Sequence, residues 1–378
     1  MLGNVFERFV EKAPVAVMVR GILERVLGPD ALNALYDRVA DKQYTRQLLF
    51  SSVVQLMNLV VCRIQPSIHA AYQDNKEGIE ASITAVYDKL SGIDTVTSRA
   101  LVRETAKQMG ESVRGMNGAC TPWLPGYQIK VLDGNCIEAT EHRLEALREI
   151  GGGALPGKSL VIYEPELEMA TDVFPCEDGH AQERSLLSAV LPTLVARDLL
   201  ITDRNFCVGG FLHGISAQQA YFICREHKGL SWEEDSEERF VGRGKSGAIY
   251  EQWIRVSDSD GNVHRYRRIR IVLNKATRDG DKVLTLVTNL SKTAAHAKQV
   301  PQTATGIYRA RGQDCRCPGY TGAARDRPRP GYRALYQTGG LYTWLAQHTG
   351  SAHGHAQGGP HDGGGGARVR RGRRHCDD

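Results

Sequence analysis

The chain has 378 residues, 41% of them hydrophobic and 24% charged, which is enough for two or three globular domains with a sizeable core. It contains no apolar run of about 18 residues, which argues against a membrane span, and Glu7 and Glu11 lie where a signal peptide needs an apolar segment. We therefore expect a cytoplasmic, nucleoid-associated protein without a membrane partner. The net charge of +5 comes from the last 78 residues, which hold twelve arginines and five aspartates, whereas residues 1–300 carry 36 basic and 38 acidic residues.

Residues 1–120 show apolar positions at helical spacing and predict an N-terminal helical domain. Gly28 and Pro29 separate a first helix from a second one, for which Asp30 is the expected cap. The most apolar helix covers residues 46–64 and ends before Pro66, and further helices are expected at 67–75, at 83–93 and from Ser98 onward. Such a domain either binds DNA ends or only packs against the rest of the chain, and the residues leave both interpretations open.

Residues 121–229 predict a mixed α/β core. Residues 127–135 (YQIKVLDGN) form an apolar strand that ends at Asp133, and residues 199–206 (LLITDRNF) form another that ends at Asp203. Between them we expect a strand hairpin across Pro165 and one amphipathic helix over 181–197, and after them a short helix and a strand over 220–226. This order places both carboxylates at the same opening of one sheet.

Residues 230–290 change to a β pattern, with two Asp-Gly hairpin signals at 260–261 and 279–280. One strand, over 264–273, is rich in arginine. It is either a solvated strand face or a basic ribbon along a phosphate backbone, and its candidate DNA-binding residues are Arg265, Arg267, Arg268 and Arg270. The sequence GRGKSG at 242–247 lacks the P-loop spacing, because position 239 is arginine, and it predicts a basic turn.

Residues 291–300 begin a helix that we expect Pro301 to stop. Residues 301–378 contain no lysine or glutamate and hold 16 of the 40 glycines, which predicts a disordered Gly/Arg/Pro/His-rich tail. This composition is also typical of a GC-rich gene translated out of frame, and we favour that interpretation.

Two strand-end aspartates suit divalent cations, because Mg²⁺ prefers rigid oxygen ligands. In a two-metal site for phosphodiester chemistry, one ion activates the attacking water or hydroxyl and the other stabilises the leaving oxygen, and a third acid normally completes the set. Each aspartate also has a simpler explanation: Asp133 could begin a turn with Gly134, and Asp203 could cap a helix. Glu183 is expected at the start of the helix that precedes the Asp203 strand, as a dipole partner or as a residue near the metals.

The ordered set of LDGN at 132–135, PCEDGHAQER at 175–184, ITDRNF at 201–206 and the β-rich segment ending LVTNL at 286–290 resembles the DDE transposases of bacterial insertion sequences. The resemblance covers about residues 1–300. It implies a ribonuclease-H-like core with a β-strand insertion, in which Asp133 and Asp203 bind two Mg²⁺ ions. It also implies double-stranded DNA as partner, both as element ends and as target, and a homodimer that holds both ends.

The sequence departs from this family after the insertion, where the family has a helix with a tyrosine, an arginine and the catalytic glutamate. Tyr308 and Arg311 have the family spacing, but the glutamate position is Cys315, and no glutamate follows Glu251. We therefore expect a transposase that is truncated or frameshifted at its C-terminal part and inactive. The alternatives are a non-catalytic DNA-binding remnant and a stand-alone metal-dependent nuclease of ribonuclease-H-like fold.

Overall fold

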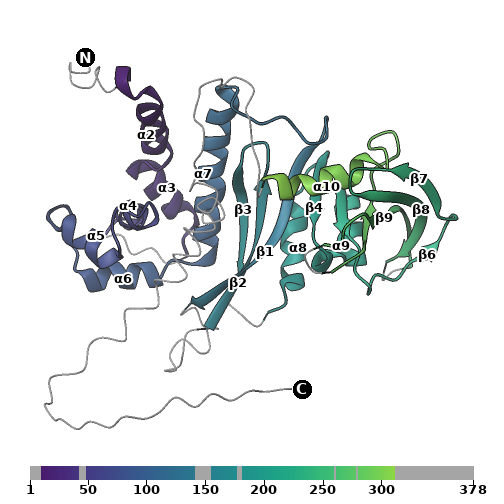
Figure 1. Cartoon of the computed structure of the whole chain (residues 1–378). Helices are drawn as coiled ribbons and strands as arrows, with labels where there is room; N and C mark the ends of the chain where they lie inside the picture. The colour runs from purple at the N-terminus through teal and green to yellow at the C-terminus, as the bar shows by residue number, and fades with distance from the viewer. Residues whose placement is uncertain are drawn as a thin grey trace, which may run out of the picture.

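The computed structural model describes residues 10–41, 48–140, 155–176, 181–258, 261–277 and 280–310. In this part of the chain a group of helices is followed by a mixed α/β region built on one large, mostly antiparallel sheet (Figure 1). None of the helices described is both long and apolar enough to cross a membrane. The prediction of a disordered tail falls, from residue 311 onward, outside the described residues.

The N-terminal helices enclose a core of their own, which runs from Leu32 to Leu101. Short polar side chains begin several of them: the Ser67 and Ser82 hydroxyls accept backbone hydrogen bonds three residues on, and Asp94 accepts one from the Thr97 amide. The helices are α2 (Pro14–Val26), α3 (Pro29–Val39), α4 (Phe50–Val61), α5 (Ile68–Asp74), the 3₁₀ helix η1 (Lys76–Gly78), α6 (Ile83–Ser91) and α7 (Thr95–Gly115).

Two predicted helix starts in this region are wrong. Helix α7 begins at Thr95 rather than at Ser98, because Asp94 is its cap. Helix α3 begins at Pro29, whose fixed φ suits a first helical turn, so Asp30 lies inside that turn and Gly28 is the N-cap.

The sheet contains ten described strands in the order β3-β2-β1-β4-β5-β10-β9-β8-β6, with β7 paired to β8. Strands β1, β2 and β3 are antiparallel neighbours, whereas β1, β4 and β5 run parallel to one another. The strands are β1 (Gln128–Thr140), β2 (Leu155–Glu164), β3 (Met169–Cys176), β4 (Asp198–Thr202), β5 (Tyr221–Arg225), β6 (Glu233–Glu234), β7 (Arg239–Arg243), β8 (Gly247–Ser257), β9 (Val263–Leu273) and β10 (Val283–Thr288).

The two faces of the sheet carry different cores. One face packs Leu132, Leu200 and Phe222 against helix α9 (Gly209–Ala217) and the residues before β4. The other face packs Ile129 and Ile201 against residues 290–300, which lead into helix α10 (Gln299–Ala310). The predicted hairpin across Pro165 joins β2 and β3, and the predicted strand after α9 is β5.

The single helix predicted over 181–197 is wrong. The structure has three short pieces, η3 (Glu183–Leu186), α8 (Leu187–Val190) and η4 (Leu191–Thr193). Pro192 lies inside η4, and since proline has no backbone N–H it cannot continue an α-helical hydrogen-bond ladder.

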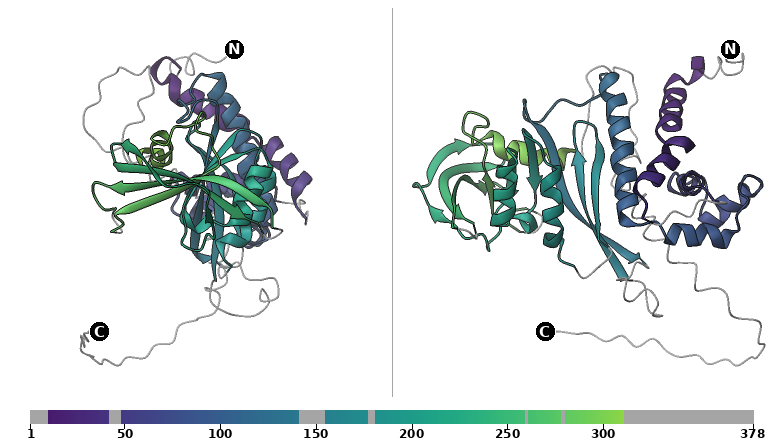
Figure 2. Two further views of the ribbon diagram at one scale, coloured as in Figure 1. Left: turned by 90° about the vertical axis from the view of Figure 1, so that its right-hand side faces the viewer. Right: turned by 180° about the vertical axis from the view of Figure 1, so that it is seen from behind.

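The chain between β5 and α10 folds as strands β6–β10, which extend the sheet away from the N-terminal helices (Figure 2). Gly261 and Gly280 have positive φ, as the two predicted Asp-Gly hairpins require, and GRGKSG forms the turn between β7 and β8. The expected helix at 291–300 is wrong, because residues 292–298 make turns and α10 starts only at Gln299. Pro301 lies in the first turn of α10, where its missing N–H costs nothing, so it does not stop the helix.

Candidate active site at the carboxyl edge of the parallel strands

Asp133 and Asp203 follow two paired positions of neighbouring parallel strands. The register of β1 against β4 pairs Val131 with Ile201 and Leu132 with Thr202, and the two aspartates are the next residue of each strand. Asp203 retains extended backbone angles, so the alternation of side chains continues to it. Because neighbouring parallel strands are about 4.8 Å apart, the two carboxylates lie side by side on one face of the sheet.

Strand β1 does not end at Asp133, contrary to the prediction. It continues to Thr140 through its pairing with β2, in which Asp133 opposes Val161 and Gly134 opposes Leu160. Only its pairing with β4 ends before Asp133, because β4 stops at Thr202. The turn interpretation of Asp133 and Gly134 is thereby excluded. Asp203 is the N-cap residue of η5 (Arg204–Phe206), but its side chain makes no capping hydrogen bond.

The two aspartates differ in exposure. Asp133 is half-buried and its Oδ1 accepts a hydrogen bond from the Gly134 amide at 3.0 Å, whereas Asp203 is exposed. Beneath Asp203, the Cys224 thiol donates a weak hydrogen bond to the Asp203 carbonyl at 3.6 Å. Burial raises the pKa of the Cys224 thiol well above its ordinary value, so this thiol stays protonated and neutral beside the site.

Glu183 lies against Gly134, the residue that follows Asp133. A Cβ built on Gly134 would be 2.5 Å from Glu183 Oε1, so the carboxyl group of Glu183 fills the space that a side chain at position 134 would occupy. Successive residues of a strand point to opposite faces, so Glu183 contacts β1 on the face opposite to the Asp133 side chain. The sequence signal for this contact was the acidic residue at the start of η3, and only the folded chain shows which strand it meets.

The face that holds the two aspartates also receives α10, since Val300 is part of the core beneath it. Residues 299–310 contain no acidic side chain. Within the described ranges, no three His, Cys, Asp or Glu side chains are grouped so as to hold a metal ion. Arg311 and Cys315 lie outside the described residues, so the structure does not place them.

The donor set fits one Mg²⁺ ion. Two carboxylates side by side on neighbouring strands, completed by water molecules, would supply the oxygen ligands that this ion usually has. A second ion has no further acidic ligand within the part of the chain that the structure describes.

The four arginines of β9 do not form a free basic ribbon. Arg268 donates two hydrogen bonds to Glu226, both 2.9 Å long, Arg270 pairs with Glu238, and Arg265 pairs with Asp235. In addition, Arg265 and Arg267 lie on one face of the strand while Arg268 and Arg270 lie on the other. DNA contact by Arg265, Arg268 and Arg270 stays a prediction.

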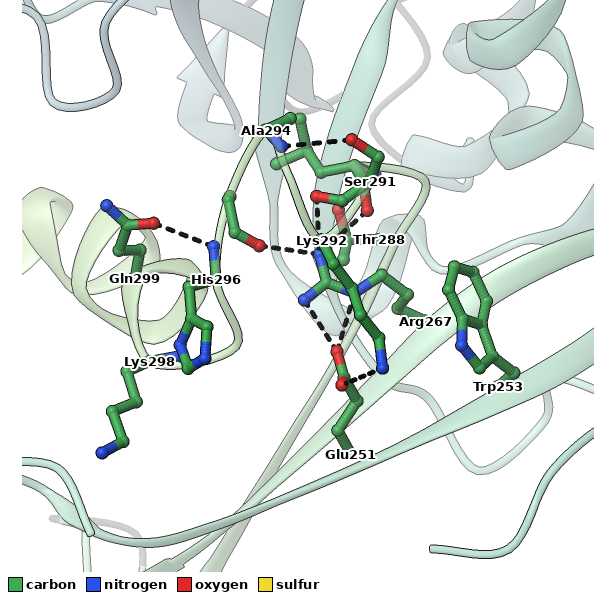
Figure 3. A network of polar contacts seen from close by, with 12 residues as sticks. Glu251, Trp253, Arg267, Thr288, Ser291, Lys292, Ala294, His296, Lys298 and Gln299 are labelled. Carbon is green, nitrogen blue, oxygen red and sulfur yellow. Dashed lines mark hydrogen bonds and ion pairs between the residues drawn. The ribbon is translucent and has the colours of Figure 1, made fainter. Parts of the chain in front are cut away.

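Arg267 corrects the prediction for its own position, because its side chain is fully buried. Its Nη1 donates to the carbonyls of Leu290, Ser291 and Ala295 at 2.8 to 3.0 Å, and its Nε donates to Glu251 at 2.8 Å (Figure 3). Lys292 pairs with the other oxygen of Glu251 at 2.9 Å. This buried guanidinium holds the segment before α10 in place through its Nη1 and Nε hydrogen bonds and does not reach a phosphate backbone.

The pKa of the Glu251 carboxyl follows from this network. Burial alone would raise the pKa, but hydrogen bonds from Lys292 and Arg267 outweigh burial, so the pKa lies below its ordinary value. Glu251 is therefore ionised at neutral pH, and its charge is balanced inside the fold.

A cavity of about 800 Å³ lies at the same edge of the sheet and is lined by the two residues that follow Asp203. Its wall includes Arg204, Asn205, Lys228 and Trp232. Sequence reasoning missed this cavity, because its residues come from η5, from the end of β5, from the start of the insertion and from β10. The available signal was the basic His227-Lys228 pair directly after a buried strand.

Comparison with known proteins assigns no family to this chain. No protein-family model matches it. No curated protein matches it either. Among solved structures it is similar to the piggyBac transposase in a cryo-EM structure of a synaptic complex with hairpin DNA, with 9% sequence identity and a TM-score of 0.34. That match covers 85% of this chain and 72% of the transposase chain. A similarity at this level does not identify a function.

Proposed function

We propose that the chain is a DNA transposase of the DDE type by descent, with Asp133 and Asp203 as the two aspartates that bind Mg²⁺. The observation that carries the proposal is the register of β1 and β4, which sets both aspartates side by side on one face at the carboxyl edge of parallel strands. In open α/β sheets, ligands bind at the carboxyl ends of the strands. A mixed sheet with the aspartates on adjacent strands agrees with the ribonuclease-H-like core that the sequence resemblance implies.

In this proposal the two strands supply rigidity. Asp133 and Asp203 would hold Mg²⁺, and the chemistry that the metal would supply there is activation of a water or hydroxyl for attack on a phosphodiester, with a second ion needed to stabilise the leaving oxygen. Asp133 is held by its pairing with β2 and by the Gly134 amide, and Asp203 by the end of β4, so neither strand has to rearrange on binding. The exposure of Asp203 leaves room for a DNA phosphate beside it.

We further propose that strand cleavage by this chain is weak or lost. Helix α10 packs on the aspartate face but carries no acid at 299–310, and the family glutamate position is Cys315. A site with two of three carboxylates binds one metal ion better than two, and the two-ion chemistry depends on both. This observation favours the second candidate function, a DNA-binding transposase remnant that recognises element ends without cutting them. In this proposal the remnant is a nucleoid-associated homodimer.

Metal binding tests the site directly. In a Mn²⁺ titration followed by electron paramagnetic resonance, the Asp133→Asn and Asp203→Asn variants should each bind the ion at least about tenfold more weakly. Asp88→Asn is the matched control, since Asp88 is an exposed aspartate on α6. Equal Mn²⁺ affinity in all three variants would contradict the assignment.

Plasmid nicking separates the two candidate functions. We expect the purified chain to bind duplex DNA in EDTA and to nick supercoiled plasmid slowly or not at all in Mg²⁺. Efficient nicking that disappears in Asp203→Asn would show that the chain is active after all, and nicking without any preference for element ends would favour a stand-alone nuclease. A chain that binds no DNA would refute both the transposase and the remnant.

The gene itself tests the proposed frameshift. Resequencing the codons for residues 298–317 and translating all three frames should reveal a helix with tyrosine, arginine and glutamate at family spacing. If no frame contains it, the Gly/Arg-rich tail is the genuine C-terminal sequence and the DNA-binding remnant becomes the better conclusion.

A further inference from the structure

The cavity beside Asp203, here called the edge pocket, lies outside the metal site. It has a volume of about 800 Å³, and its wall includes Arg204, Asn205, Lys228, Leu230, Trp232 and Val283. Arg204 and Asn205 follow Asp203 directly in the chain, and Lys228 follows the end of β5. The edge pocket therefore opens at the same carboxyl edge of the sheet as the two aspartates, and its residues Leu230 and Trp232 belong to the core on the other face of the sheet.

The acidic residues of the edge pocket are already neutralised. Asp281 pairs with Arg225 at 2.6 Å. Glu226 accepts two hydrogen bonds from Arg268, each 2.9 Å long, and its side chain is largely buried. Each acid thus has an arginine of its own, and neither repels an incoming anion with a full charge.

Two cations of the edge pocket have no such partner. Arg204 and Lys228 are exposed, and neither forms an ion pair with any residue that the structure describes. The side-chain amide of Asn205 likewise makes no hydrogen bond within the described ranges, although the Asn205 carbonyl accepts one from Arg184 at 2.7 Å. These groups provide two positive charges and a neutral donor, which is the chemistry that binds a phosphate.

The rest of the wall combines the polar residues His227 and Thr285 with three apolar or aromatic ones. Leu230, Trp232 and Val283 line it, and the Arg268 guanidinium lies 4.9 Å from the centre of the Trp232 ring. Such a surface suits the sugar and base of a nucleotide, while the cations suit its phosphate. Ordinary ligand pockets measure roughly 300 to 1,000 Å³, so the edge pocket is large enough for one nucleotide unit.

From this combination we propose that the edge pocket binds one nucleotide of the DNA strand that passes Asp133 and Asp203, with Arg204 and Lys228 neutralising its phosphate. The identity of that strand rests on the proposed function, whereas the phosphate chemistry rests on the edge pocket alone. A free inorganic phosphate or pyrophosphate offers the same chemistry, and the experiment distinguishes these sources.

The experiment measures DNA affinity without metal. Fluorescence anisotropy of a labelled mixed-sequence DNA, as single strand and as duplex, is recorded in EDTA with the full chain and with Arg204→Gln and Lys228→Gln. Arg197→Gln is the matched control, because Arg197 is an exposed arginine just before β4, at the opposite edge of the sheet, and its loss changes the net charge equally. All three residues are exposed, so circular dichroism should show unchanged folding.

Each edge-pocket variant should lower DNA affinity about fivefold at about 0.15 M salt, since one phosphate contact contributes a salt slope of about 0.9 for duplex DNA and about 0.7 for a single strand. The salt slope should fall by no more than about 0.9 for duplex DNA and about 0.7 for a single strand, in either variant or in the double variant, since Arg204 and Lys228 neutralise the same phosphate. Arg197→Gln should leave affinity and slope unchanged.

Three results would overturn the proposal. Equal losses in Arg197→Gln would mean that overall charge, not the edge pocket, determines affinity. Unchanged DNA affinity in both edge-pocket variants, together with pyrophosphate binding that those variants abolish, would make the cavity a small-anion site. If the full chain binds no DNA, DNA is not the ligand of the edge pocket. The Mn²⁺ titration at Asp133 and Asp203 is independent of all three, so failure of the metal site and failure of the edge pocket are told apart.

Discussion

At the scale of single residues, Gly134 and Glu183 explain why the chain beside Asp133 tolerates only a small residue. The Glu183 carboxyl occupies the position where a Cβ at residue 134 would lie. The contact is between a side chain and a strand backbone, so a larger residue at 134 must displace either Glu183 or β1. Displacing β1 would move Asp133 away from Asp203, which links a packing constraint to the geometry of the site.

We expect Gly134→Ala to lower the free energy of unfolding by at most about 1 kcal/mol, the low end of the usual cost of overpacking, because the half-buried Glu183 carboxyl is at the end of a flexible side chain. The double variant Gly134→Ala with Glu183→Ala should recover most of that loss, and urea denaturation measures both. Gly21→Ala is the control, since nothing lies within 4 Å of its Cβ position in α2, and a helical alanine there should stabilise by about 0.5 to 1 kcal/mol. A double variant as unstable as the single one would show that Glu183 is not the obstacle.

At the scale of elements, Arg267 joins the insertion to the segment that precedes α10. Its guanidinium crosses from β9 to Glu251 on β8 and to three carbonyls of residues 290–295. Because Val300 at the start of α10 packs on the aspartate face, this network fixes how the insertion and α10 meet the site.

We expect Arg267→Met to lower the free energy of unfolding by about 3 to 5 kcal/mol, because it leaves Glu251 and the three carbonyls without their buried partner. Lys292→Ala removes the exposed side of the same network and should cost less than about 1 kcal/mol, since the Lys292 side chain is 56% exposed. Thermal and urea denaturation compare the two variants. Similar costs for both would contradict the assignment of Arg267 as the anchor.

A contact between α9 and β9 makes the stability of the fold depend on pH. His213 on α9 stacks on His264 of β9 with 3.8 Å between ring centres, and its Nδ1 is 2.7 Å from the Tyr266 hydroxyl. Burial, and then the neighbouring His264, lower the pKa of His213, whereas Ser257 and Asp258 oppose this shift in part. Burial also raises the pKa of Tyr266 to about 12, so its hydroxyl stays protonated at neutral pH.

Because the pKa of His213 is lower in the folded chain, His213 is protonated in the unfolded chain but neutral in the folded chain at a pH between the two pKa values. Stability from neutral His213 is therefore complete above the ordinary pKa of about 6.5 and is lost as the pH falls through the lower folded value. We expect urea midpoints measured between about pH 7.5 and 5 to fall less steeply in His213→Asn than in the unmodified chain. His69→Asn, at an exposed position of α5, is the control and should leave the slope of urea midpoint against pH as it is in the unmodified chain. If His213→Asn also leaves this slope unaltered, the explanation is refuted.

At the scale of the whole molecule, the helical core and the two sheet cores are separate, and α7 joins them through β3. The strongest polar link is Arg99 to Asp172, with two hydrogen bonds of 2.9 Å. The Arg99 guanidinium also lies 4.1 Å from the centre of the Phe174 ring. A second link, Arg114 to Glu164, lies further along α7.

We expect Asp172→Ala to cost about 3 kcal/mol, since it leaves Arg99 without its buried partner, and to split unfolding into two transitions. Circular dichroism at a helical and at a sheet-sensitive wavelength would then give different midpoints. Arg20→Ala, which removes an exposed i,i+4 pair with Glu24, should cost no more than about 0.5 kcal/mol and leave one transition. A single, coincident transition in Asp172→Ala would mean that apolar contacts alone couple the two parts.

Local patterns predicted most elements and several of their ends. The Asp-Gly pairs predicted hairpins because glycine accepts positive φ, and the apolar runs predicted β4, β5 and the insertion strands. One of the errors arose where a tertiary contact overrides local preference, and two arose from the local effect of a proline. Pairing with β2 carries β1 past Asp133, Pro192 divides the predicted helix, and Pro301 fits the first turn of α10 instead of ending a helix.

The sequence by itself determined which two aspartates follow apolar strands, that a β-rich segment separates them from the last helix, and that no glutamate follows Glu251. These features depend on residue type and short-range spacing, which a linear chain displays. Only the tertiary structure decided that β1 and β4 are in register, that Arg267 is buried while Arg204 and Lys228 are exposed, and that Glu183 lies against Gly134. The physical reason is that the burial of an arginine and its carboxylate partner depend on strands far apart in sequence. A run of arginines therefore has the same sequence pattern whether it contacts DNA or stabilises a sheet.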